Sequence, residues 1–154
     1  GVGKSTVARA LSEATGSSLI VGDDLYNFEE EAHLEWEEKL QNGWDRILNT
    51  CKQQLGKHND LVIDFVVEDE LPWLMDQLSD HDCRFVYIVL LADKDTILNR
   101  LEERDDLRYK DRSMELLNQL SKDPFNKSYL LDTTTKEIKD TVQEITTSPR
   151  FIVA

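Results

Sequence analysis

The chain has 154 residues, of which 40% are hydrophobic, which is enough for one domain with one buried core. Its formal net charge is −13, and so acidic a surface repels phosphate backbones and argues against nucleic acid as a main partner. The sequence has no long apolar run for a membrane span, and its two cysteines, Cys51 and Cys83, lack the spacing of a zinc site. We therefore expect a cytoplasmic protein that binds neither nucleic acid nor membrane.

Strand and helix patterns alternate along the chain, which predicts a single α/β domain over residues 1–154 with a mostly parallel sheet. The predicted helices cover residues 5–15, 29–40, 44–55, 72–78, 96–103, 113–120 and 138–145. The predicted strands cover residues 18–21, 61–67, 84–91 and 129–131. The run at 84–91 is the clearest strand, because nearly all of its residues are apolar or β-branched.

The first residues match the second half of the phosphate-binding loop GxxxxGK[ST]. They are Gly1, Val2, Gly3, Lys4, Ser5 and Thr6. In such a loop backbone N–H groups wrap the phosphates, the lysine reaches the β- and γ-phosphates, and the hydroxyl ligates Mg²⁺. We expect the first three residues to bind phosphate, Lys4 to supply the charge and Ser5 the metal ligand. Thr6 would add a phosphate contact at the positive end of the helix.

The first half of this pattern would lie before residue 1, together with the strand that leads into the loop. A P-loop sheet without that strand would lack a central member and leave edges open. The simplest interpretation is a fragment that lacks a short N-terminal segment. A truncated protein that binds no nucleotide is the other possibility, and a chance match before an ordinary helix is a third.

Three acidic residues lie at the predicted ends of strands. Asp23 and Asp24 follow residues 18–21, where open α/β sheets place their ligand crevice. We expect Asp23 to orient or deprotonate an attacking hydroxyl, with Asp24 as the alternate; either could instead cap the next helix. Asp64 interrupts an apolar strand, so it is expected to hold Mg²⁺ or to be satisfied by backbone N–H groups.

The main concentration of positive charge is a cluster between residues 100 and 112. On one helix, Arg100, Arg104 and Arg108 would share a face. We expect Arg104 and Arg108 to act from a lid at about residues 104–112, where guanidinium groups neutralise charge on a transferring phosphoryl group. Because acidic residues are interleaved with them, a solvated helix with weak ion pairs is the alternative.

With these parts in view, the sequence resembles the small P-loop kinases of the gluconate kinase and shikimate kinase type. It looks closest to their uncharacterised bacterial relatives and is also similar to chloramphenicol phosphotransferase. The segments that carry the likeness are GVGKST, VGDDL, IVLLAD, LNRLEER and LDTT. The resemblance implies a three-layer α/β/α P-loop fold that binds ATP and Mg²⁺. It also implies that residues 132–134, including Thr133 and Thr134, lie near the adenine.

We therefore predict transfer of the γ-phosphoryl group of ATP to a hydroxyl of a small molecule. The alternatives are a nucleoside or nucleotide kinase and a non-catalytic ATP-binding module that docks a partner protein. Residues 25–40 are acidic with few cations, whereas the gluconate and shikimate sites hold a carboxylate with basic residues. A neutral or cationic hydroxyl compound is therefore easier to accommodate. Trp36 or Trp44 could line its site.

Overall fold

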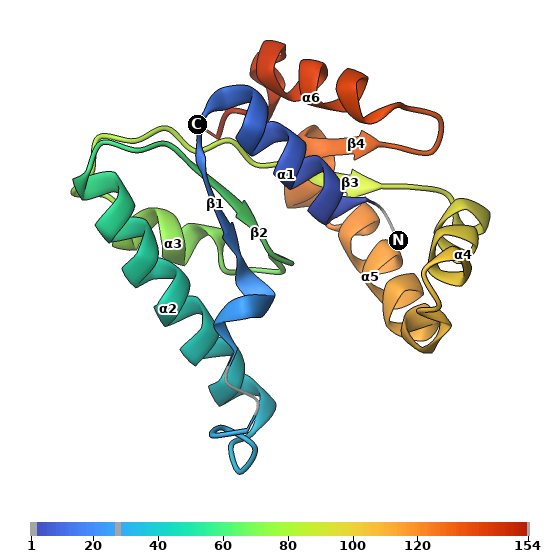
Figure 1. The fold of residues 1–154 in the computed structure, drawn as a ribbon, viewed down its shortest axis with the longest axis horizontal. Helices are drawn as coiled ribbons and strands as arrows, with labels where there is room; N and C mark the ends of the chain where they lie inside the picture. The colour runs from blue at the N-terminus through green and yellow to red at the C-terminus, as the bar shows by residue number, and fades with distance from the viewer. Residues whose placement is uncertain (1–2, 27–28, 154) are drawn as a thin grey trace. The chain divides into compact units, whose positions relative to one another are not determined.

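The computed structural model describes residues 3–26 and 29–153 (Figure 1). Its α-helices are α1 (Lys4–Thr15), α2 (Trp36–Gly56), α3 (Leu71–Gln77), α4 (Lys94–Glu103), α5 (Lys110–Lys122) and α6 (Ile138–Thr147). Its strands are β1 (Ser18–Val21), β2 (Leu61–Asp64), β3 (Val89–Leu91) and β4 (Leu130–Asp132). Short 3-10 turns are η1 (Gly22–Leu25), η2 (Leu107–Tyr109), η3 (Pro124–Tyr129) and η4 (Pro149–Phe151). Across the described ranges, no helix combines the length and apolar character that crossing a membrane requires.

The chain forms two compact units, one made of residues 1–7 and 84–154 and the other of residues 8–83. We call them the P-loop unit and the acidic unit. Each contains one pair of parallel strands, β3–β4 in the P-loop unit and β1–β2 in the acidic unit. The predicted α/β class with parallel strands is thus confirmed.

In the acidic unit, β1 and β2 run in parallel register from Ser18 beside Leu61 to Val21 beside Asp64. Helix α2 packs on both strands. Its buried face repeats at helical spacing, which is the pattern of an amphipathic helix facing a core. That face consists of Trp44, Ile47, Leu48 and Cys51.

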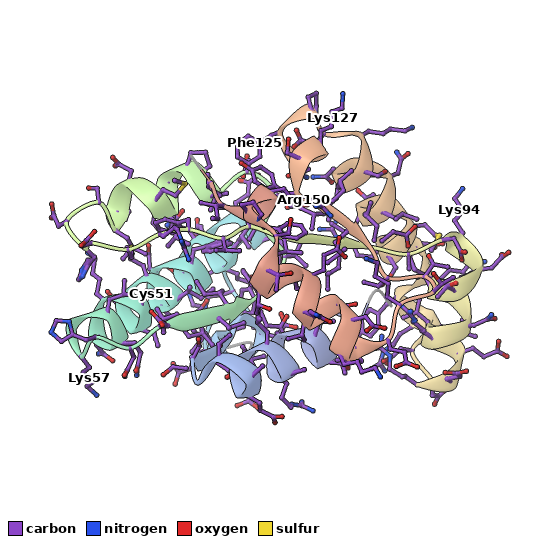
Figure 2. The ribbon with its side chains drawn as sticks, turned by 90° about the horizontal axis from the view of Figure 1, so that it is seen from above. Cys51, Lys57, Lys94, Phe125, Lys127 and Arg150 are labelled. Atoms are coloured by element: carbon purple, nitrogen blue, oxygen red, sulfur yellow. The ribbon has the colours of Figure 1, made fainter. Side chains whose placement is uncertain are left out.

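In the P-loop unit, α5 contacts β3, and Figure 1 shows α6 on the opposite side of the β3–β4 pair. Ile97 and Leu101 of α4 are buried with Ala92, and Met114 and Leu117 of α5 pack against them. Lys94 on α4 and Lys127 on η3 point outward (Figure 2). The core of this unit therefore holds α4 and α5 in place beside the strand ends.

One helix replaces the two predicted at residues 29–40 and 44–55. Helix α2 begins only at Trp36 and continues through Gly43 to Gly56, so the predicted break is wrong. Glycine commonly ends a helix, so Gly43 favoured a break between two helices. In the structure, a Cβ at this position would lie 3.0 Å from the ring of Tyr26. The glycine therefore allows the close approach of an aromatic ring to a continuous helix.

The strand predicted at residues 84–91 is shorter, since β3 covers only Val89–Leu91. The first half of the run pairs elsewhere: Val86 forms an isolated antiparallel bridge with Ile152. Tyr87 N–H donates to Phe151 O at 2.8 Å beside this bridge. The apolar run correctly predicted extended backbone at residues 86 and 87. The hydrogen-bond partners of these residues, however, come from the C-terminal segment and not from β4.

Candidate functional site

The end of the phosphate loop lies at the start of α1. Gly3 has φ +85°, a left-handed conformation that favours glycine, and its carbonyl accepts the N–H of Val7 at 2.9 Å. Lys4 is the first residue of α1, and the first turn of the helix carries no acidic residue. The positive end of the helix dipole is therefore not offset by a carboxylate within that turn. Gly1 and Val2, also predicted to bind phosphate, lie outside the described residues.

A pocket of about 470 Å³ opens beside this helix start, within the P-loop unit. The phosphate loop and the loop after β4 contribute backbone and hydroxyl groups to this pocket. The cationic side chains come from α4, from the residue that follows it, and from the loop after β4. The residues that matter here are Gly3, Thr6, Arg100, Arg104, Thr133 and Lys136. Two acidic residues, Glu103 and Glu137, also line the pocket, and Lys136 is paired with Glu144. The helix N-terminal amides and the arginines are the groups in this lining that suit an anion.

Arg100 ties α4 to the loop that follows β4. Its guanidinium donates to the carbonyl oxygen of Thr133 at 3.0 Å and to the Thr133 hydroxyl at 3.4 Å. Thr133 is buried, and its N–H and hydroxyl both donate to Leu91 O, at 2.7 and 3.0 Å. The pocket wall thus joins α4, β3 and β4 through one residue.

The neighbouring Thr134 holds the two strand ends together. Its hydroxyl accepts the N–H of Asp93 at 2.9 Å, and its own N–H donates to Asp132 Oδ1 at 2.8 Å. That hydrogen bonding lowers the pKa of Asp132, and the Thr96 side chain and N–H lower the pKa of Asp93. Both carboxylates therefore stay ionised as caps of the loop and of α4.

The three arginines predicted to share a helix face do not do so. Helix α4 ends at Glu103, Asp105 has φ +57°, and Asp106 N–H bonds Leu101 O at 2.8 Å, which closes the helix. Arg104 lines the pocket just beyond this end. Arg108 is outside the pocket lining, 73% exposed, and within 3.8 Å of Asp106. Residues 104–112 contain the turn that follows α4, then η2 and the start of α5.

In the acidic unit, the predicted acids lie where β1 and β2 end. Asp23 and Asp24 are exposed on η1, directly after β1. Asp64 is only 3% exposed and is the last residue of β2, beside Val21 in the parallel register. The carboxyl ends of both strands therefore carry carboxylates on one edge, the position of ligand sites in open α/β sheets.

Beside these acids lies a chain of touching aromatic rings, Trp36, Tyr26, Phe65, Trp44 and Trp73, which we call the aromatic cluster. Tyr26 is stacked on Trp36 with ring centroids 6.1 Å apart. It lies 5.7 Å from Phe65, which lies 5.1 Å from Trp44. From the middle of α2, Arg46 donates to Leu25 O at 2.8 Å and pairs with buried Glu31.

The AAA domain family AAA_18 matches residues 1–121. The chain belongs to this family. A search of the curated proteins found no match. Among solved structures, the chain is similar to "a putative kinase" from Chloroflexus aurantiacus J-10-fl, with 17% sequence identity, coverage of 94% of this chain and 88% of that chain, and a TM-score of 0.58. At this identity the likeness shows the fold, so this AAA domain has a P-loop kinase fold.

Within each unit of this AAA domain, some predicted residues come together. The pocket unites Gly3, Thr6, Arg104 and Thr133, whereas Ser5 is exposed on the same first helical turn. Arg100 and Lys136 were not predicted to line a site. The sequence did contain a signal for Arg100, because it precedes the predicted site residue Arg104 by one helical turn. No sequence pattern pointed to Lys136.

A Gly22→Ala substitution should destabilise the acidic unit. Gly22 is buried, and a Cβ there would lie 2.2 Å from the ring of Phe65, which also contacts Tyr26 and Trp44. We expect a loss of about 1–3 kcal/mol in the free energy of unfolding, as in other overpacked cores. Denaturant titration measures it. Gly56→Ala is the control, since nothing lies within 4 Å of its Cβ position; an equal loss there would contradict the prediction.

Tyr26 should titrate later than an ordinary tyrosine. Its pKa is raised from 10.0 to about 12. Burial of the phenol is the largest cause, and the negative charges of Asp23 and Glu70 add to it. Since the unfolded chain loses this proton first, the residue's contribution to folding stability should fall as pH rises from about 10 to about 12. Tyrosinate absorbance and denaturant titrations of wild type and Tyr26→Phe measure this. Identical alkaline curves for the two proteins would contradict it.

Proposed function

We propose that this AAA domain transfers the γ-phosphoryl group of ATP to a hydroxyl of a small molecule, with residues 1–154 acting as one catalytic domain. The observation that carries the proposal is the pocket at the start of α1. It combines a glycine-shaped phosphate-loop end with Arg100, Arg104 and Lys136. Such a wall suits the polyanionic chain of a nucleoside triphosphate.

The residues of the phosphate loop would hold the triphosphate. Backbone N–H groups of Gly1, Val2 and Gly3 would wrap it, Lys4 would bind the β- and γ-phosphates, and Thr6 would add a contact at the helix start. Thr133 and Thr134 would lie near the adenine. The position of Thr133 in the lining of the pocket supports this role.

The oxygen donors of Ser5 and Asp64 suit Mg²⁺, which prefers hard oxygen ligands and binds carboxylates with retained water. Ser5 is exposed at the start of α1, and Asp64 ends β2. When bound, the ion would neutralise charge on the phosphates. Two reduced cysteines, Cys51 and Cys83, are compatible with the cytosol as the site of reaction.

In the transfer step, the acceptor hydroxyl oxygen forms a bond to the γ-phosphorus while the bond from that phosphorus to the β-phosphate oxygen breaks. The products are a phosphate monoester, ADP and one proton. Asp23 would orient the hydroxyl and receive its proton, which then passes to solvent. Arg104 and Arg108, on a lid at about residues 104–112, would neutralise the charge on the phosphoryl group and help exclude water.

The test is a screen of the full-length protein for ADP release with MgATP. The acceptors are small hydroxyl compounds, nucleosides and nucleoside monophosphates. We expect ATP alone to turn over slowly and at least one hydroxyl compound to accelerate ADP release and gain a phosphate, seen by phosphorus NMR. Acceleration by nucleosides alone would support a nucleoside kinase instead. Tight ATP binding with no acceptor at all would favour a binding module and overturn the proposal.

A further inference from the structure

The two units divide the charge of the chain unequally. Residues 8–83 contain eighteen acidic and five basic residues, a net charge of −13, whereas the remaining residues contain thirteen of each. The whole net charge of the protein therefore belongs to the acidic unit. Such a unit repels an anionic acceptor and raises the local concentration of a cationic one.

At the exposed end of the aromatic cluster lies Trp36, which is 57% exposed at the start of α2. Its stacked partner Tyr26 is half-buried, and the two planes are inclined by only 25°. The two stacked rings therefore present an aromatic surface at the start of α2. The face of an indole or phenol ring attracts a cation within about 6 Å of its centroid.

Two carboxylates of the acidic unit influence this stack electrostatically. Asp23 lies on η1, three residues before Tyr26, and Glu70 precedes α3 with Oε2 accepting the N–H groups of Glu68 and Asp69 at 2.8 and 3.0 Å. Both charges raise the pKa of the Tyr26 phenol, after the larger effect of its burial. The cation Arg46 is engaged by Glu31 and Leu25 O. Negative charge and aromatic faces thus meet at the same place.

We infer that the phosphoryl acceptor is a cationic amino alcohol, whose ammonium group lies against Trp36 and Tyr26 with Asp23 and Glu70 as counter-charges. This inference rests on the proposed function, and its transfer step is the one written above. The hydroxyl would reach Asp23 while the cation is held by the rings. The product would carry both a phosphate and an ammonium group.

The test compares each cationic alcohol with an uncharged compound of the same shape, using the full-length protein. Choline is paired with dimethylbutanol, in which carbon replaces the quaternary nitrogen, and ethanolamine is paired with propanol. Binding without nucleotide is measured by ligand NMR, and ADP release with MgATP is measured separately. We expect a preference for the cation of roughly tenfold or more in kcat/KM and in affinity, and a loss of affinity as salt is raised.

Variants locate the effect. Trp36→Ala should remove the preference for the cation and Trp36→Phe should keep most of it, because a ring face remains. Phe125→Ala is the control, since Phe125 is 49% exposed in another aromatic group, in the P-loop unit (Figure 2). Equal use of charged and uncharged alcohols, or no binding of choline and ethanolamine, would overturn the inference and leave the kinase proposal standing. Cation binding at Trp36 without ADP release from any alcohol would instead overturn the kinase proposal.

Discussion

We expect Lys4→Ala to lower the rate of phosphoryl transfer about 100- to 1,000-fold, the range seen when one preorganised donor to transition-state charge is removed. ATP affinity should fall about 10- to 100-fold, in line with the loss of a hydrogen bond to a charged group. Lys4 is the first residue of α1, beside the pocket residues Gly3 and Thr6. The ammonium would bind oxygens on which charge accumulates as the bond breaks.

The control for this change is Lys94→Ala. Lys94 is likewise the first residue of a helix in the P-loop unit, it is exposed, and Figure 2 shows it pointing away from α4. It lies outside the pocket lining. Equilibrium dialysis with ATP and the ADP-release assay should therefore separate the two variants, with similar melting temperatures. Equal losses in both would indicate a general charge effect, and no loss in Lys4→Ala would remove the phosphate loop from the mechanism.

The second large effect is expected for Asp23→Asn, which should lower kcat/KM for the acceptor about 100- to 10,000-fold, the usual contribution of a positioned general base. ATP affinity should stay near the wild-type value, because Asp23 belongs to the acidic unit and not to the pocket at α1. Its carboxylate is exposed on η1, so folding stability should change little. The measurement is steady-state ADP release at saturating MgATP.

Asp24→Asn is a matched control from the next position of the same turn. Both residues are exposed acids in the first turn of η1, so the two variants lose the same charge from the same segment. If only Asp24→Asn lowered kcat/KM for the acceptor, Asp24 and not Asp23 would be the residue that acts on the hydroxyl. Unchanged transfer rates in both variants would show that neither aspartate acts on the hydroxyl.

Much of the secondary structure was predictable because its signals are local. Residues 18–21 form the predicted strand with the same bounds, and α1 begins one residue before the predicted helix. Predictions failed where a distant residue decided the outcome. Gly43 continues a helix because Tyr26 packs against it, and residues 84–88 stay out of β3 because Tyr87 bonds to the C-terminal segment.

The residues of the candidate sites were likewise predictable where the signal is local, and unpredictable where a distant contact places them. Lys4, Ser5 and Asp23 follow from motif spacing and strand ends, and their catalytic roles stay predictions. The contact of Arg100 with Thr133 spans 33 positions in sequence, so no local pattern contained it. The aromatic cluster likewise joins η1, α2 and the segments around α3.

By itself, the sequence determined the P-loop character of this protein, its parallel α/β class and its excess of negative charge. These depend on a short glycine-lysine motif, on hydrophobic periodicity and on composition, all of which act over a few residues or none. Only the tertiary structure decided which cations face the phosphate-loop pocket and which rings stand beside Asp23. Those arrangements depend on contacts between residues far apart in the chain, which packing selects and sequence spacing does not encode.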